Sequence, residues 1–83
     1  MQKETVIQVE LDGQTYVLRG SGDEEILHSS ATLVAQKIAA IRVRCPNYST
    51  TRAAMLAALQ IAEEMLVLKE EYRDMLNAAD IFP

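Results

Sequence analysis

The residues that could carry out catalysis are few in this sequence of 83 residues. It holds one histidine, His28, and one cysteine, Cys45, whereas a zinc site takes about four such ligands. The carboxylates at 63–64 and 70–71 are adjacent, so on a helix their side chains diverge by about 100°. The sequence contains no glycine-rich phosphate loop and no Ser/His/Asp spacing. We therefore expect no enzyme, no cofactor and no metal.

A cluster of basic residues stands out because the chain as a whole is acidic, with a formal net charge of −4. The cluster spans the end of one predicted helix and the start of the next. The helix dipole also favours cations at a helix C-terminus, so the pattern alone leaves ordinary solvation and a binding role both open. The candidate binding residues are Lys37, Arg42, Arg44 and Arg52.

The amino-acid composition indicates which class of protein this is. With 49% hydrophobic and 24% charged residues, the chain is typical of folded globular proteins. A chain this short buries only roughly 60% of its unfolded surface, so we expect oligomerisation to stabilise it. The negative charge argues against nucleic acid as a partner. No apolar run approaches the roughly 20 residues of a membrane span, so we expect a soluble cytoplasmic protein without membrane insertion.

Residues 5–19 predict a β-hairpin. Asp12 and Gly13 lie between two runs rich in Val, Ile, Tyr and Leu, and both tolerate the positive φ angles of a two-residue type I′ turn. This register makes one face apolar and the other mostly polar. A two-stranded hairpin is marginally stable in water, so its apolar face must be covered. That face comprises Ile7, Val9, Leu11, Gln14, Tyr16 and Leu18.

A first helix is predicted from near Asp23 to near Arg44. Ser21 and Glu24 have the spacing of a capping box, and Pro46 prevents the helix from continuing. Apolar residues at spacings of three and four form one stripe for packing. The stripe is Leu27, Ala31, Val34, Ile38 and Ile41, widened by Ile26 and Leu33.

A second helix, capped by Ser49 or Thr50, is predicted to run to about Ala79. From 54 to 66 it carries two apolar rows, and beyond that one row at heptad spacing, which is typical of a coiled coil. A helix of this length spans roughly 45 Å, more than the hairpin and first helix can cover, so we expect a two-fold homodimer. The predicted oligomerisation seam is Ala54, Ala58, Ile61, Met65, Leu68, Tyr72 and Met75.

These elements predict one domain of the α+β class. Residues 1–48 supply the hairpin and the first-helix part of a small head. Residues 49–83 form the long helix, whose N-terminal half completes the head and whose C-terminal half forms a homo-oligomeric coiled coil.

Three stretches, in this order and spacing, are similar to one known family. They are the hairpin segment Ile7–Tyr16, the acidic helix start Asp23–Glu25 and, most specifically, Arg52–Glu64. The chain thereby resembles the ZapA family, bacterial accessory proteins of the division ring that bind the tubulin-like FtsZ. The resemblance implies a head on a dimerising coiled coil, with dimers able to pair into tetramers. It also implies that the head contacts FtsZ through charged residues, here best matched by Arg42 and Arg44.

The function implied by the resemblance is non-enzymatic. The protein would bind FtsZ and bundle its protofilaments, promoting assembly and stability of the Z-ring at mid-cell and hence septation. Since a symmetric dimer presents two heads, weak single contacts suffice through avidity. The alternatives are a generic dimeric coiled-coil adaptor and a small dimeric DNA-binding regulator whose basic residues touch phosphates.

Overall fold

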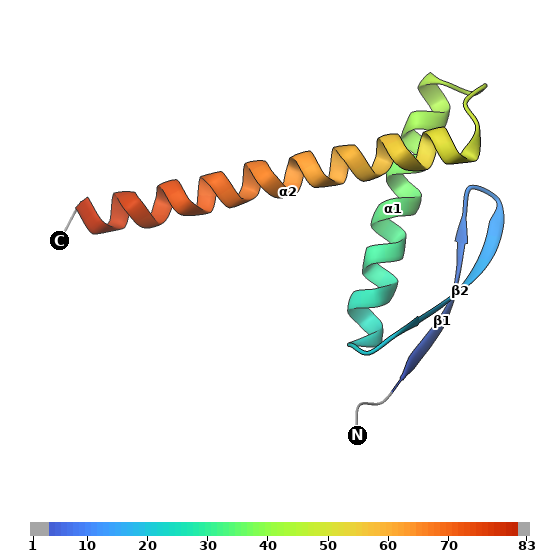
Figure 1. The fold of residues 1–83 in the computed structure, drawn as a ribbon, viewed down its shortest axis with the longest axis horizontal. Helices are drawn as coiled ribbons and strands as arrows, with labels where there is room; N and C mark the ends of the chain where they lie inside the picture. Colours follow the sequence, from blue (N-terminus) through green and yellow to red (C-terminus); the bar gives the residue numbers. More distant parts are fainter. Residues whose placement is uncertain (1–3, 82–83) are drawn as a thin grey trace.

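The protein folds as a hairpin, a helix and a second, longer helix, in that order. The computed structural model describes residues 4–81. Strands β1 (Thr5–Leu11) and β2 (Gln14–Gly20) precede helices α1 (Glu24–Arg44) and α2 (Thr50–Ile81). Figure 1 shows that β1, β2, α1 and the first turns of α2 form a head from which α2 extends. The predicted α+β fold, with a hairpin and helix head followed by a long helix, is confirmed.

The hairpin has the predicted turn and register. Asp12 and Gly13 have φ angles of 52° and 79°, as a type I′ turn requires. Ile7 faces Leu18 and Val9 faces Tyr16 across the antiparallel pair, while Leu11 faces Gln14. On the apolar face, Ile7 and Val9 of β1 are buried against α1, whereas Tyr16 of β2 is exposed and Leu18 is partly buried. A single helix therefore covers the β1 half of the apolar face.

Helix α1 begins at Glu24, and its N-cap is Asp23 rather than Ser21. The Asp23 carboxylate accepts a hydrogen bond of 2.8 Å from the backbone N–H of Glu25 and adds negative charge where the helix dipole favours it. The predicted stripe is confirmed, with Leu27 and Val34 partly buried and Ala31, Ile38 and Ile41 buried. Ile26 and Leu33 do not widen it. Both are exposed, because neither the hairpin nor α2 reaches their side of the helix.

Helix α2 begins at the predicted cap, where Ser49 Oγ accepts a hydrogen bond of 3.1 Å from the backbone N–H of Arg52. It packs on α1 through Ala53 and Ala57, which are completely buried against Ile38 and Ile41. The two apolar rows of the 54–66 segment are not the centre of this contact. The contact lies mainly on the neighbouring face instead, because the two small alanine side chains let the helices approach closely.

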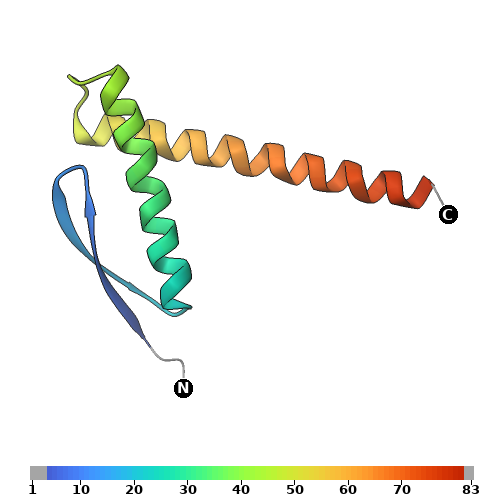
Figure 2. The same ribbon diagram turned by 180° about the vertical axis from the view of Figure 1, so that it is seen from behind.

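The single chain is flat and extended. Its radius of gyration is 17.0 Å, against roughly 12 Å for a compact chain of this length. Its extents are 53 × 43 × 14 Å, and the thin dimension is close to the diameter of one helix, about 10–12 Å. Seen from behind in Figure 2, α2 leaves the head with no other element beside most of its length. Most of α2 therefore has no neighbouring element in the single chain.

Candidate protein-binding site

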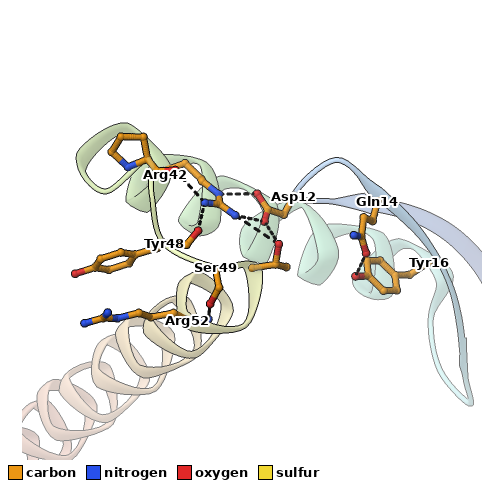
Figure 3. Close-up of polar contacts among 9 residues, drawn as sticks. Asp12, Gln14, Tyr16, Arg42, Tyr48, Ser49 and Arg52 are labelled. Carbon is orange, nitrogen blue, oxygen red and sulfur yellow. Dashed lines mark hydrogen bonds and ion pairs between the residues drawn. The ribbon is translucent and has the colours of Figure 1, made fainter.

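Four segments meet at one end of the head. They are the hairpin turn (Asp12–Gly13), the last turn of α1, the connector 45–49 and the first turn of α2, and we refer to this region as the corner (Figure 3). Of the predicted binding residues, Arg42, Arg44 and Arg52 lie in the corner. Lys37 lies further back along α1. The structure thus brings together three of the four basic residues that the sequence singled out.

The Arg42 side chain is directed into the corner and is only 28% exposed. Its Nε and Nη2 atoms donate to the two carboxylate oxygens of Asp12 at 2.9 and 2.6 Å, in a bidentate ion pair. Nη1 donates to the carbonyl oxygen of Pro46 at 3.3 Å and to that of Tyr48, and Nη2 also donates to Thr50 Oγ at 3.4 Å. Arg42 therefore connects the hairpin turn to the connector and to α2.

Asp12 is the acceptor around which the corner is organised. It is 11% exposed, and besides Arg42 it accepts a hydrogen bond of 2.6 Å from the Thr50 hydroxyl. The hydrogen bonds from Arg42 and then Thr50 lower the pKa of Asp12 from its ordinary 3.8 to about 2, against the opposing effect of partial burial. The hydrogen bonds to Asp12 likewise raise the pKa of Arg42. Both groups are therefore charged at neutral pH.

Lys37 is engaged within the chain as well. Its ammonium group forms an ion pair with Glu64 of α2, and its side chain is 23% exposed. This pair joins the two helices beyond the Ala53 and Ala57 contact, so Lys37 supports the angle at which α2 leaves the head.

Arg44 and Arg52 are the two basic side chains that face solvent at the corner. Arg52 lies over the ring of Tyr48, with its guanidinium carbon 4.3 Å from the ring centroid, a cation–π geometry. Within residues 4–78, whose side chains the structure describes, neither arginine has an ion-pair partner. Both can therefore donate hydrogen bonds to a carboxylate of another molecule.

The predicted seam of α2 lies on a different surface. Ala54 and Ile61 are partly buried at the edge of the head, whereas the rest of the seam is exposed along the helix. A second apolar row, Met55, Leu59 and Leu66, is also exposed. A 32-residue helix with this much apolar surface in water is typical of a helix that pairs with another chain.

The roles of Asp12, Tyr48 and Thr50 could not be predicted from the sequence. Asp12 was interpreted only as a turn residue, and Thr50 only as an alternative helix cap. Their contacts with Arg42 span 30, 6 and 8 residues respectively, and the first of these has no local sequence pattern. A turn aspartate in a chain with a basic cluster was the one available signal.

Two further features are absent from the described part of the chain. No group of three or more His, Cys, Asp or Glu side chains is placed to hold a metal ion. Neither helix, over the residues described, is long and apolar enough to cross a membrane.

A hairpin and helix head joined to a long helix with exposed apolar rows defines a class of small proteins that associate through that helix. Comparison with known proteins places the chain within this class. The family model described as "Cell division protein ZapA" matches residues 7–80. The chain belongs to the ZapA family of cell division proteins.

The chain is also similar to individual proteins of this family. The chain is 29% identical over 76 residues to the cell division protein ZapA of Geobacillus sp. (strain WCH70), covering 92% of this chain and 87% of the relative. It is 34% identical over 64 residues to that of Shouchella clausii (strain KSM-K16), covering 77% and 82%. Among solved structures, it is similar to a ZapA mutant dimer from Geobacillus stearothermophilus. That match has a TM-score of 0.72, 30% identity and coverage of 96% and 93%. The dimer supports homo-oligomerisation of this chain.

Proposed function

We propose that this protein is a non-enzymatic accessory factor of cell division that binds FtsZ and cross-links its protofilaments at the mid-cell ring. Membership of the ZapA family carries the proposal. The chain supplies two separate surfaces that such a factor needs. The seam of α2 joins copies of the chain, and the corner of each head contacts a filament.

The partner-facing side chains in this proposal are Arg44 and Arg52. Both are exposed, and an acidic patch on a filament would complement them. Lys37 and Arg42, the other two predicted binding residues, have their charged groups engaged with Glu64 and Asp12. A charge reversal that included Arg42 would disturb the corner itself, so the test is confined to Arg44 and Arg52.

The seam supplies the second half of the mechanism. When two chains pair through Ala54, Ala58 and the exposed residues that follow, the assembly carries two corners. Once one corner holds a protofilament, the second contact is intramolecular, so weak single contacts still give bundles. Tetramers would add two further corners.

The experiment is co-sedimentation of FtsZ filaments, assembled with GTP, with and without this protein. We expect the protein to pellet with FtsZ and the mass of bundles to rise. The double variant Arg44→Glu with Arg52→Glu should reduce both effects while its own mass in solution stays unchanged.

The matched control is Arg73→Glu, which reverses the charge of an exposed arginine on α2 far from the head. It should bundle FtsZ like the wild type. If the wild-type protein stays in the supernatant, the FtsZ proposal is wrong and the chain is a self-associating adaptor of another kind. If the double variant pellets like the wild type, the corner is not the contact surface.

A further inference from the structure

The guanidinium group of Arg42 uses all of its hydrogen-bond donors inside the protein. An arginine side chain has five N–H donors and no acceptor. Here Nε makes one hydrogen bond, Nη1 makes two and Nη2 makes two, and all the acceptors belong to this chain. A carboxylate of another molecule could bind Arg42 only by displacing these partners.

The acceptors of Arg42 lie on three different segments, as Figure 3 shows. Asp12 belongs to the hairpin turn, Pro46 and Tyr48 to the connector, and Thr50 to the first turn of α2. Among the described residues, the side-chain hydrogen bonds that connect the hairpin to the connector or to α2 all pass through Asp12 or Arg42. The position of the hairpin turn relative to the connector therefore depends on this pair.

The segments held in this way carry the side chains that face solvent. The connector carries Tyr48, and the ring of Tyr48 lies under Arg52 of α2. The carbonyl group of Tyr48 is itself an acceptor for Arg42, so a shift of Arg42 moves the backbone that bears the ring. A change at the hairpin turn can thus reach Arg52 through Arg42 and Tyr48.

We infer that Arg42 is a positioning residue for partner binding. Its bidentate ion pair with Asp12 fixes the positions of Tyr48 and Arg52, and Arg42 does not itself contact the partner. The inference rests on the proposed function, because it assigns the contact with an acidic filament surface to Arg44 and Arg52.

Asp12→Asn separates this role from a direct contact, because the two predict effects of opposite sign. Asparagine tolerates the left-handed backbone angle at this position, so the turn is retained while the ion pair is lost. If Arg42 contacted the partner, the variant would free its guanidinium group and make the corner more positive, so binding would be unchanged or stronger. If Arg42 is a positioning residue, binding is weakened although every basic residue is still present.

Arg42→Lys gives a second, independent test that keeps the charge in place. A lysine ammonium group cannot reproduce the planar fork that holds both oxygens of Asp12. A direct contact through a point charge would survive this change, whereas the positioning role would not. Should Asp12→Asn fail to fold, as judged by circular dichroism, Arg42→Lys carries the test alone.

The experiment has two readouts on the full chain. In the free protein, because the Arg52 guanidinium carbon lies 4.3 Å from the ring centroid of Tyr48, we expect the ring current to shift the NMR resonances of the neighbouring Arg52 Cδ protons upfield, and Tyr48→Leu defines the unshifted position. We expect Asp12→Asn and Arg42→Lys to lose most of this shift and also to lower the amount of protein that pellets with FtsZ. Asp74→Asn, the same chemical change at an exposed position on α2, should alter neither readout.

If the Arg52 resonances of both folded variants stay at their wild-type positions, the inference is overturned. It is also overturned if both variants pellet with FtsZ as much as the wild type does. The two proposals can fail separately. If the wild-type protein does not pellet with FtsZ, the proposed function is wrong, while the Arg52 resonances still decide whether Arg42 positions the corner.

Discussion

Replacing Leu68 by glutamate tests whether the exposed apolar side chains of α2 are the surface through which copies of this chain associate. Leu68 is 66% exposed in the single chain and lies in the middle of the predicted seam. In an isolated chain the change would be nearly neutral, because it replaces one solvent-facing side chain by another. In a paired helix it would place a carboxylate where an apolar side chain was buried.

The expected size of the effect follows from the area that pairing covers. Complete burial of a leucine side chain contributes about 1.5–3 kcal/mol, so covering the 66% that is exposed contributes about 1–2 kcal/mol per chain. A two-fold dimer contains the residue twice and therefore loses about 2–4 kcal/mol. At about 1.4 kcal/mol per factor of ten, the dissociation constant should rise about 30- to 700-fold. Burial of the new carboxylate would weaken association further.

Sedimentation equilibrium over a range of concentrations measures this change directly. The wild type should show multiples of the 9.2 kDa chain mass, and Leu68→Glu should shift towards the single-chain mass. The control is Val67→Glu, which adds the same charge at a neighbouring exposed position that points about 100° away from the seam. If Leu68→Glu associates as tightly as Val67→Glu, the seam is not the interface.

Two further predictions concern the head. Ile38→Ala removes most of a buried side chain from the contact with α2, so the free energy of unfolding in urea should fall by about 2–4 kcal/mol, and an unchanged urea midpoint would contradict this core. The second prediction concerns the loss of stability at low pH. Hydrogen bonds from Arg42 and Thr50 lower the pKa of Asp12 in the folded protein to about 2, and Glu10 lines the same surface pocket as Asp12 and Arg42. The stability that Asp12 contributes is therefore complete above its ordinary pKa of 3.8 and is lost as the pH falls through about 2. The urea midpoint of Asp12→Asn should therefore lie below that of the wild type near neutral pH and approach it towards pH 2, whereas a gap independent of pH would argue against the ion pair.

The elements of this fold could be predicted from the sequence because their signals are local. The positive φ angles that Asp12 and Gly13 tolerate set the hairpin register, and Pro46 sets the end of α1. The packing of the helices was harder to predict. The sequence shows two apolar rows on α2 from 54 to 66, yet the main contact with α1 uses Ala53 and Ala57. Periodicity shows that a face is apolar, but it does not show which neighbour covers it.

The basic residues of the candidate site could be predicted as a group, but their separate roles could not. Arg42 and Arg44 are the same residue type, two positions apart at the end of one helix, and no local feature distinguishes them. Their side chains point about 200° apart around the helix, so one faces the hairpin turn and the other faces solvent. The residue that decides between them is Asp12, which is 30 positions away in the chain. A long-range ion pair of this kind becomes visible only once the fold is known.

On the proposed function, one short chain must associate and bind a filament at the same time, and the separation of the two surfaces along α2 would allow this. The large exposed side chains of the seam begin at Met65, so about 20 Å of continuous helix separates them from Arg52 in the first turn of α2. Pairing through this part of the seam would leave the corners uncovered, and the helix would fix the distance between them. On the proposed function, variants of the two surfaces should then fail in different ways. Leu68→Glu retains the single contact with a filament but loses the avidity of a second one, whereas Arg44→Glu with Arg52→Glu retains the assembly but loses the contact.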